Sequence, residues 1–217
     1  MLPWEPHDHT PAFDDEAVDV TRHFTHLKLS LMPYLAGAAR EAHGQGTPMA
    51  RPMLLEFPGD RGTVGLDTQY MLGGSLLVAP VFSAEGRVEY YVPEGIWTHL
   101  LDGHQVTGPR WVSEEYGFES LPLLVRPGTV LPVGAQTTTP EYDWADGVTL
   151  RLSELPDGYD ATTVVPAAQS VGGGDTEFRV VRDGAQVRVT SASTKPWRVQ
   201  VGERVVDSGP DGVVVEV

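Results

Sequence analysis

The chain of 217 residues allows one large or two small domains, and its hydrophobic fraction of 41% is ordinary for a folded protein. Its 30 acidic and 15 basic residues give a formal net charge of −15, which argues against nucleic acid as a partner because phosphates require a basic surface. The sequence has no cysteine, no visible leader and no apolar run of the ~18–20 residues that cross a bilayer, so we expect a cytoplasmic protein without disulfides or membrane spans.

The first 13 residues contain three prolines and no apolar periodicity, which predicts an irregular segment. His7, Asp8 and His9 are residue types that bind metal ions, but further ligands at a useful spacing are missing. We therefore expect a solvated loop here and predict neither a metal site nor a cofactor. His23 and His26 are expected on the surface of the following helix rather than as ligands.

A helix is predicted from about residue 18 to residue 42. Residues 14–16 are acidic, which favours the positive end of the helix dipole and is more typical of a helix start than of an acid/base pair. Pro33 predicts a kink near Ser30, because proline lacks an N–H and crowds the carbonyl four residues earlier. Gly46 is expected to end the helix. Apolar residues recur at helical spacing at Val20, Phe24, Leu27, Leu31, Leu35, Ala38 and Ala42.

Two apolar runs follow, at residues 49–57 and 75–82, and turn residues bound both of them. Neither run alternates apolar with polar residues, which predicts strands covered on both faces, as in a parallel sheet or barrel wall. A helix followed by such a strand is one step of a (β/α)8 barrel, which needs eight strands to close. Arg51 and Glu56 lie within or beside the first run, where a structural ion pair is favoured over a role at the barrel mouth.

From residue 75 onward the pattern indicates all-β structure. A turn is predicted at residues 93–95, and the Asp-Gly pair at 102–103 is typical of a hairpin. Residues 136–141 form a polar connector, and the tail beyond it has the regular short strands of an antiparallel sandwich. The glycines at 172–174 are expected in a loop, since no helix or Lys-Ser/Thr follows them. Strands are expected at 88–92, 96–101, 121–125, 130–133, 150–152, 162–165, 178–182, 187–190, 198–201 and 213–217.

Two kinds of residue are candidates for sugar contacts. Asp143 and Asp146 flank Trp144, an arrangement that suits a sugar ring and its hydroxyls, although an ordinary surface loop is favoured. The tryptophans at 97, 111 and 197 lie in or beside predicted strands, so core packing is favoured over a binding platform. No G-x-S-x-G context suggests a hydrolase triad.

Several ordered blocks of the chain together resemble glycoside hydrolase family 31, and within it the α-xylosidases. The similarity is clear over residues 1–135 and weak beyond them. The blocks are Pro3-Trp4, Arg22 to Lys28, Leu31 to Leu35, Gly46 to Met53, Glu56 to Asp60, Gln69 to Gly73, Leu76 to Phe82, Tyr91 to Leu100 and Leu121 to Gly128.

The resemblance implies an α/β plus all-β chain with three parts. Residues 1–73 would be the end of a (β/α)8 catalytic barrel, with its terminal helix and strand. Residues 74–136 and 137–217 would be a proximal and a distal C-terminal β-domain, both of antiparallel sandwich type.

The resemblance also implies the C-terminal fragment of a retaining α-glycosidase that releases terminal α-linked xylose or glucose from oligosaccharides. That chemistry needs two carboxyl groups about 5–5.5 Å apart, and in the family both are aspartates upstream of this segment. We therefore assign no catalytic residue to this chain, leave its substrate-binding residues unknown, and expect no activity from it alone.

Two alternatives stay open at this point. The chain could be a β-sandwich module that binds carbohydrate or a partner protein without catalysis. It could instead complement a separately encoded barrel portion or form a homo-oligomer, which would cover an apolar face on residues 18–57.

Overall fold

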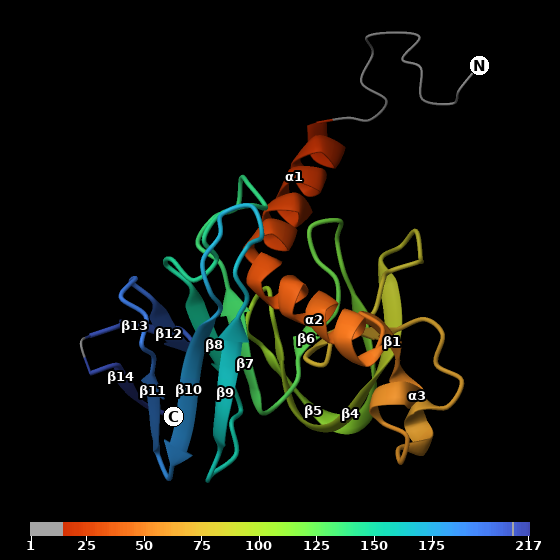
Figure 1. The fold of residues 1–217 in the computed structure, drawn as a ribbon. Helices are drawn as coiled ribbons and strands as arrows, with labels where there is room; N and C mark the ends of the chain where they lie inside the picture. The colour runs from red at the N-terminus through yellow and green to blue at the C-terminus, as the bar shows by residue number, and fades with distance from the viewer. Residues whose placement is uncertain (1–14, 210) are drawn as a thin grey trace, which may run out of the picture.

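The computed structural model describes residues 15–209 and 211–217, and it opens with two helices (Figure 1). Helix α1 spans Asp15–Ser30 and helix α2 spans Met32–Gln45. The break falls at Leu31, as Pro33 predicts, since a proline is tolerated only in the first turn of the second helix. The kink predicted near Ser30 is thus found as a break that divides the one predicted helix into two. The segment with His7, Asp8 and His9 lies outside the described residues.

Helix α2 ends where a glycine permits a left-handed residue. Gly46 has φ 77° and its N–H donates to the Ala42 carbonyl at 3.0 Å, which satisfies one of the free carbonyls of the last turn. Glycine at this position therefore sets the predicted helix end.

Helix α2 is fastened to both β-regions of the chain. On one side the Tyr34 hydroxyl hydrogen-bonds backbone groups of the first sheet. On the other side Arg40 pairs with Asp175 at 2.6 Å, and Met32 and Ala36 pack against the core of the C-terminal region. The helix therefore fixes the position of one region relative to the other.

The segment after α2 differs from the strand predicted at residues 49–57. Only Ala50–Pro52 forms a strand, β1, and Met53–Glu56 forms the one-turn helix α3. Pro52 has no N–H to continue a ladder, and the Phe57 N–H instead donates to the Met53 carbonyl at 2.9 Å. The predicted long strand covered on both faces is therefore wrong: in β1 itself only Arg51 is buried.

Six strands form the first sheet, in the order β1-β2-β3-β6-β4-β5, with every pairing antiparallel. Because β1 pairs antiparallel with β2, it has no parallel neighbour among the described residues, and the closing strand of a barrel stays a prediction. Strands β3 and β6 are buried along their whole length. A 3-10 turn at Arg61–Thr63 precedes the remaining strands, which are β2 (Tyr70–Leu72), β3 (Leu76–Val78), β4 (Arg87–His99), β5 (Gln105–Glu115) and β6 (Leu123–Val125).

Strand β4 joins two predicted strands into one. The register moves from Val92 opposite Arg110 to Gly95 opposite Gly108, so residues 93–95 form a bulge rather than the predicted turn. A side chain on Gly108 would place its Cβ 1.9 Å from the Pro93 carbonyl oxygen. Glycine is therefore required for the two backbones to approach each other here. The hairpin predicted at residues 102–103 is confirmed, since it joins β4 to β5.

The C-terminal region consists of two four-stranded sheets, ordered β14-β11-β10-β9 and β13-β12-β8-β7, whose buried side chains form one core. Strand β8 runs parallel to β12, so the prediction of purely antiparallel pairing is wrong at this point. Strand β7 belongs to this region although the predicted boundary at residue 136 follows it; the three-domain division stays a prediction. The strands are β7 (Thr129–Val133), β8 (Thr149–Ser153), β9 (Asp160–Val165), β10 (Thr176–Asp183), β11 (Gln186–Thr190), β12 (Arg198–Val201), β13 (Arg204–Asp207) and β14 (Val213–Glu216).

Across residues 15–209 and 211–217, neither the length nor the hydropathy of any helix suffices for a bilayer span. The cytoplasmic location stays a prediction.

Candidate functional site

Helix α1 projects from the body of the molecule and buries none of its residues (Figure 1). Its apolar residues nevertheless follow a helical period, and Val20, Phe24 and Leu27 on that stripe are only half-buried. An amphipathic helix gains most of its stability by packing its apolar stripe against another element. The stripe of α1 therefore lacks a full packing partner within the described chain.

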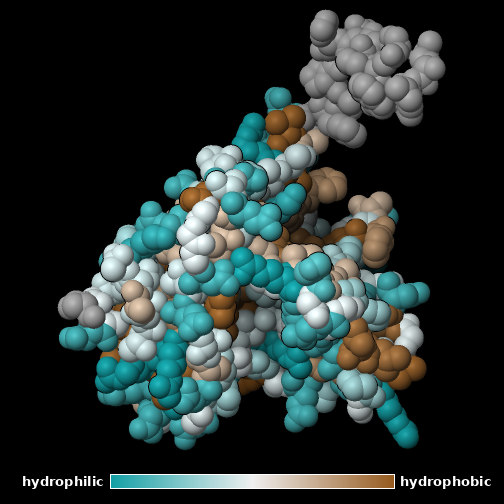
Figure 2. All heavy atoms as spheres, viewed as in Figure 1, coloured by the Kyte–Doolittle hydropathy of each residue, from teal (hydrophilic) through white to brown (hydrophobic). Residues whose placement is uncertain are grey.

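Helix α3 adds a second exposed apolar surface. Met53 is fully buried and anchors the turn, while Leu54 and Leu55 face outward with 47% and 52% of their surface exposed. Val64, in the loop beyond, is more exposed still. Figure 2 shows hydrophobic side chains gathered over α3 and near the outer end of α1. Exposed apolar side chains that gather in this way are typical of interaction sites.

A groove of about 450 Å³ lies between α1 and the loops at residues 80–86 and 116–121. Phe24 of α1 lines one side, and Phe118 lines the other with 74% of its surface exposed. Phe82, near the groove, is 77% exposed. We call the apolar face the exposed apolar residues of α1, α3, the loop after α3 and these two loops, together with the half-buried Phe24; its members are Val18, Phe24, Leu54, Leu55, Val64, Phe82 and Phe118.

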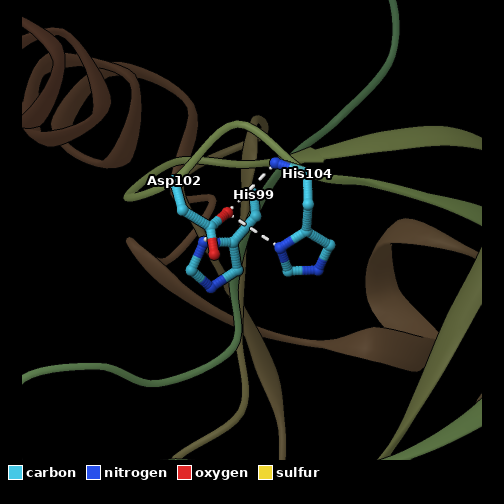
Figure 3. A group of neighbouring side chains, drawn as sticks. All are labelled: His99, Asp102 and His104. Atoms are coloured by element: carbon cyan, nitrogen blue, oxygen red, sulfur yellow. Dashed lines mark hydrogen bonds and ion pairs between the residues drawn. The ribbon is translucent and has the colours of Figure 1, made fainter.

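One group among the described residues has the ligand types of a metal site. His99, Asp102 and His104 surround the turn between β4 and β5, and their potential ligand atoms lie within 4.8 Å of one another. Figure 3 shows the Asp102 carboxylate beside both imidazole rings. Sequence inspection treated residues 102–103 only as a turn and missed the group, although the spacing His-x-x-Asp-x-His was available as a signal.

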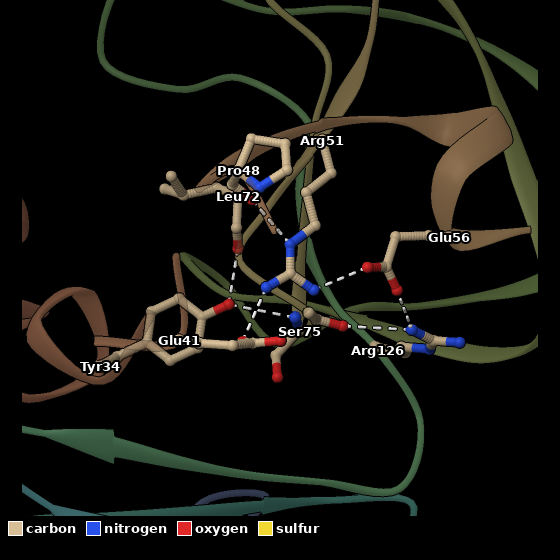
Figure 4. Close-up of polar contacts among 9 residues, drawn as sticks. Tyr34, Glu41, Pro48, Arg51, Glu56, Leu72, Ser75 and Arg126 are labelled. Atoms are coloured by element: carbon tan, nitrogen blue, oxygen red, sulfur yellow. Dashed lines mark hydrogen bonds and ion pairs between the residues drawn. The ribbon is translucent and has the colours of Figure 1, made fainter. Parts of the chain in front are cut away.

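An ion-pair network around the buried Arg51 joins α2, β1 and α3 (Figure 4). Arg51 on β1, whose side chain is only 5% exposed, contacts Glu56 of α3 and Glu41 of α2, each at 2.7 Å. Its Nε donates to the Pro48 carbonyl at 2.9 Å. The second oxygen of Glu56 pairs with Arg126 at 2.9 Å. The predicted ion pair between Arg51 and Glu56 is thus confirmed, with two partners that sequence reasoning missed.

The ion pairs of this network favour the charged form of Arg51. Burial alone lowers the pKa of Arg51, but its hydrogen bonds to Glu56 and Glu41 outweigh that effect, so the pKa lies above its ordinary value. Arg126 also stacks over the Phe57 ring at 4.6 Å. Both carboxylates are occupied by guanidinium groups, which is the arrangement of a structural junction rather than of a reacting pair.

The three tryptophans predicted in cores do not share one environment. Trp97 is fully buried and donates to the Pro93 carbonyl at 3.0 Å, and Trp197 packs edge-on against Phe178. The prediction is confirmed for these two. Trp111 lies on the outer part of β5, half-exposed and tilted against the ring of Tyr91, so its predicted core position is wrong. The odd-numbered residues of β5, Trp111 among them, are all exposed, whereas the opposite face is mostly buried or half-buried.

The candidate sugar contact around Trp144 is closed to a sugar. The indole is buried in the C-terminal core and donates to the Pro140 carbonyl at 2.9 Å. Asp143 is bound by the Lys195 ammonium group. A ring that is already packed has no free face for a pyranose, so the surface-loop interpretation holds for the carboxylates and a structural role for the tryptophan.

Two family models match this chain in succession. Residues 46–131 match the "Glycosyl hydrolase family 31 C-terminal domain", and residues 143–217 match "Alpha-xylosidase YicI, C-terminal domain".

Curated relatives include α-xylosidases from a fungus and a bacterium. The chain is 45% identical over 149 residues to "Alpha-xylosidase" of Emericella nidulans, covering 65% of this chain and 19% of the relative. It is 39% identical over 168 residues to "Alpha-xylosidase XylQ" of Lactiplantibacillus pentosus, covering 76% of this chain and 21% of the relative. The chain thus spans about a fifth of the length of these relatives.

Solved structures share the fold. A Flavobacterium johnsoniae GH31 dextranase complexed with glucose superposes with a TM-score of 0.77 at 23% identity, over 91% of this chain and 27% of that one. The cycloalternan-forming enzyme of Listeria monocytogenes, in complex with a pentasaccharide substrate, gives 0.75 at 26% identity, over 87% and 18%. The GH31 α-xylosidase of Xanthomonas citri gives 0.71 at 19% identity, over 96% and 25%.

Proposed function

The chain belongs to the C-terminal portion of glycoside hydrolase family 31, with α-xylosidases among its relatives, and we propose that it is the non-catalytic C-terminal part of a retaining α-glycosidase. The whole enzyme would release terminal α-linked xylose or glucose from oligosaccharides. The α-xylosidase relatives support xylose, and the glucose and pentasaccharide bound by two structural neighbours support an oligosaccharide substrate.

The reactive carboxylates of the proposed enzyme lie outside this chain. A retaining mechanism requires a nucleophile and an acid/base about 5–5.5 Å apart on either side of the anomeric carbon. Glu41 and Glu56 both contact Arg51, and Glu56 also contacts Arg126. Glu41 is partly buried and Glu56 is largely buried. Both carboxylates are held in ion pairs, which supports a catalytic pair elsewhere in the enzyme.

The observation that carries the proposal is the apolar face, above all the unburied stripe of α1. We assign one occupant to it, the catalytic barrel portion of the same enzyme. The matches cover only 19% and 21% of the two relatives, so most of each enzyme is available to cover such a surface. The ion-pair network around Arg51 would hold α2, β1 and α3 rigid under the barrel.

The test mixes this chain with the remaining part of the Lactiplantibacillus pentosus α-xylosidase, outside its match to this chain. We expect a complex on size-exclusion chromatography, and we expect Leu54→Ser with Leu55→Ser to weaken it at least tenfold. Val205→Ser, an equally exposed valine on β13, is the matched control and should leave the complex unchanged. No complex, or equal loss in both variants, contradicts the assignment of the face.

Activity separates the remaining alternatives. The purified chain should release no nitrophenol from 4-nitrophenyl α-xyloside, whereas the complex should; turnover by the chain alone refutes a non-catalytic role. Calorimetric binding of xylo- or gluco-oligosaccharides by the chain alone would favour the binding-module alternative. A stable dimer that is abolished by the Leu54 and Leu55 substitutions would replace the barrel with a second copy as occupant.

A further inference from the structure

The turn between β4 and β5 brings three potential metal ligands together. His99 ends β4, Asp102 opens the Asp-Gly turn, and His104 leads into β5. Two backbone hydrogen bonds fix this turn: the His99 N–H donates to the His104 carbonyl at 2.8 Å, and the Gly103 N–H donates to the His99 carbonyl at 3.0 Å. The three side chains therefore start from a rigid backbone, as a binding site requires.

The tautomer of His99 follows from its hydrogen bond. Its Nε2 lies 2.9 Å from the Leu121 carbonyl oxygen, which can only accept, so Nε2 carries the proton. In the neutral ring the lone pair then resides on Nδ1. The ring is fully buried, so this nitrogen cannot turn to water.

The His99 Nδ1 atom is buried without a hydrogen-bond partner. The Asp102 Oδ1 atom lies 3.0 Å from this nitrogen but makes no hydrogen bond to it. An unpaired lone pair thus lies beside a carboxylate oxygen, an unfavourable contact in a buried place. A divalent cation bound about 2.1 Å from both the His99 Nδ1 atom and the carboxylate oxygen would attract both atoms and so relieve the unfavourable contact.

His104 supplies a third ligand from the open side. Its Nδ1 lies 2.8 Å from the same Asp102 oxygen, and its ring stacks on His99 with centroids 4.7 Å apart and planes inclined by 18°. Asp102 and His104 are exposed, so both can adjust and water can reach the position between them. Two imidazoles, one carboxylate and a water are a donor set that suits Zn²⁺.

We propose that His99, Asp102 and His104 form a zinc site that binds one Zn²⁺ ion and locks the β4–β5 turn. The donor atoms would be the Nδ1 of His99, a carboxylate oxygen of Asp102 and a ring nitrogen of His104, with water completing a tetrahedron. The site belongs to the first sheet, and none of its three ligands is part of the apolar face, so it stands independently of the glycosidase proposal.

The test is calorimetric titration of untagged, chelator-treated protein with Zn²⁺ at neutral pH. We expect one ion per chain, and Asp102→Asn or His104→Ala should each weaken binding at least about tenfold. Both residues are exposed, so these variants leave the buried ring of His99 and the fold in place. The control is the double variant His7→Ala with His9→Ala, which should bind as the wild type does.

Each result decides the proposal. Binding that depends on Asp102 and His104 but not on His7 and His9 supports it, as do cobalt(II) absorption bands of a tetrahedral complex that vanish in His104→Ala. No binding to the wild type overturns it. Binding that survives both single substitutions, or that is lost only with His7 and His9, overturns it as well.

Discussion

Replacing Arg51 by methionine tests the ion-pair network at its centre. The substitution keeps the apolar stem but removes a guanidinium that contacts two carboxylates at 2.7 Å and one carbonyl at 2.9 Å. Removing one partner of a buried pair costs about 3–5 kcal/mol. Glu56 retains Arg126, and the partly exposed Glu41 can turn to water, so we expect a loss of about 2–4 kcal/mol in the free energy of unfolding. Urea unfolding followed by tryptophan fluorescence measures it.

The matched control is Arg87→Met. Arg87 pairs with Glu115 at 3.0 Å, but both side chains are about 70% exposed, so the expected change is within about 0.5 kcal/mol. In a double-mutant cycle, Arg51→Met and Glu56→Gln should couple by about 0.5–3 kcal/mol, because the two groups share one network. The reasoning is refuted if Arg51→Met changes stability no more than Arg87→Met does.

Three further predictions concern the bulge in β4, the contacts of helix α2 and the loss of stability at low pH. Gly108→Ala should lower stability by about 1–3 kcal/mol in urea, because its Cβ would strike backbone at 1.9 Å, whereas Gly117→Ala meets open space and should be neutral. Tyr34→Phe should lose about 1–3 kcal/mol, since a backbone donor and a backbone acceptor lose their partner; an unchanged melting temperature contradicts this. The Arg40 hydrogen bond holds the pKa of Asp175 below its ordinary value, so the stability from this pair is present above about pH 4 and lost as pH falls further. The difference in unfolding midpoint between wild type and Arg40→Met should therefore close in acid, and a difference that is independent of pH contradicts it.

The helical start of the chain was predictable because its signals are local. Pro33 dictates a break wherever the surrounding residues fold, and Gly46 permits the left-handed residue that ends α2. Most strands of the C-terminal region were predictable for a similar reason, since β10 and β11, for example, alternate apolar with polar residues and are joined by an Asp-Gly turn. Strand β13 was not predicted.

The predictions are wrong where contacts with distant parts of the chain decide between local backbone conformations of similar free energy. Residues 49–57 read as one apolar run, but Pro52 ends the ladder and only burial of Met53 selects the helical turn that follows. Residues 93–95 have turn chemistry, yet pairing with β5 converts them into a bulge. Strand β5 was not predicted because its residues alternate little between apolar and polar types, although its pairing with β4 exposes one face and partly buries the other.

In the candidate sites, too, local contacts could be predicted from the sequence and long-range contacts could not. Arg51 and Glu56 are five residues apart, so their pairing was within reach of sequence reasoning. Arg126 joins them across 70 residues, which only the packing of β6 against β3 brings about. The His99 group lies within six residues, but its chemical interest comes from the burial of one nitrogen, and burial is a property of the whole fold.

Because α2 is fastened to the first sheet through Tyr34 and to the C-terminal sheets through Arg40, heat should melt the two β-regions together. A scanning calorimeter would then record a single endotherm whose van't Hoff enthalpy equals the calorimetric one. Two β-modules that meet along the sequence only in a short linker would instead melt in separate steps. The helix thus turns neighbouring modules into one cooperative folding unit.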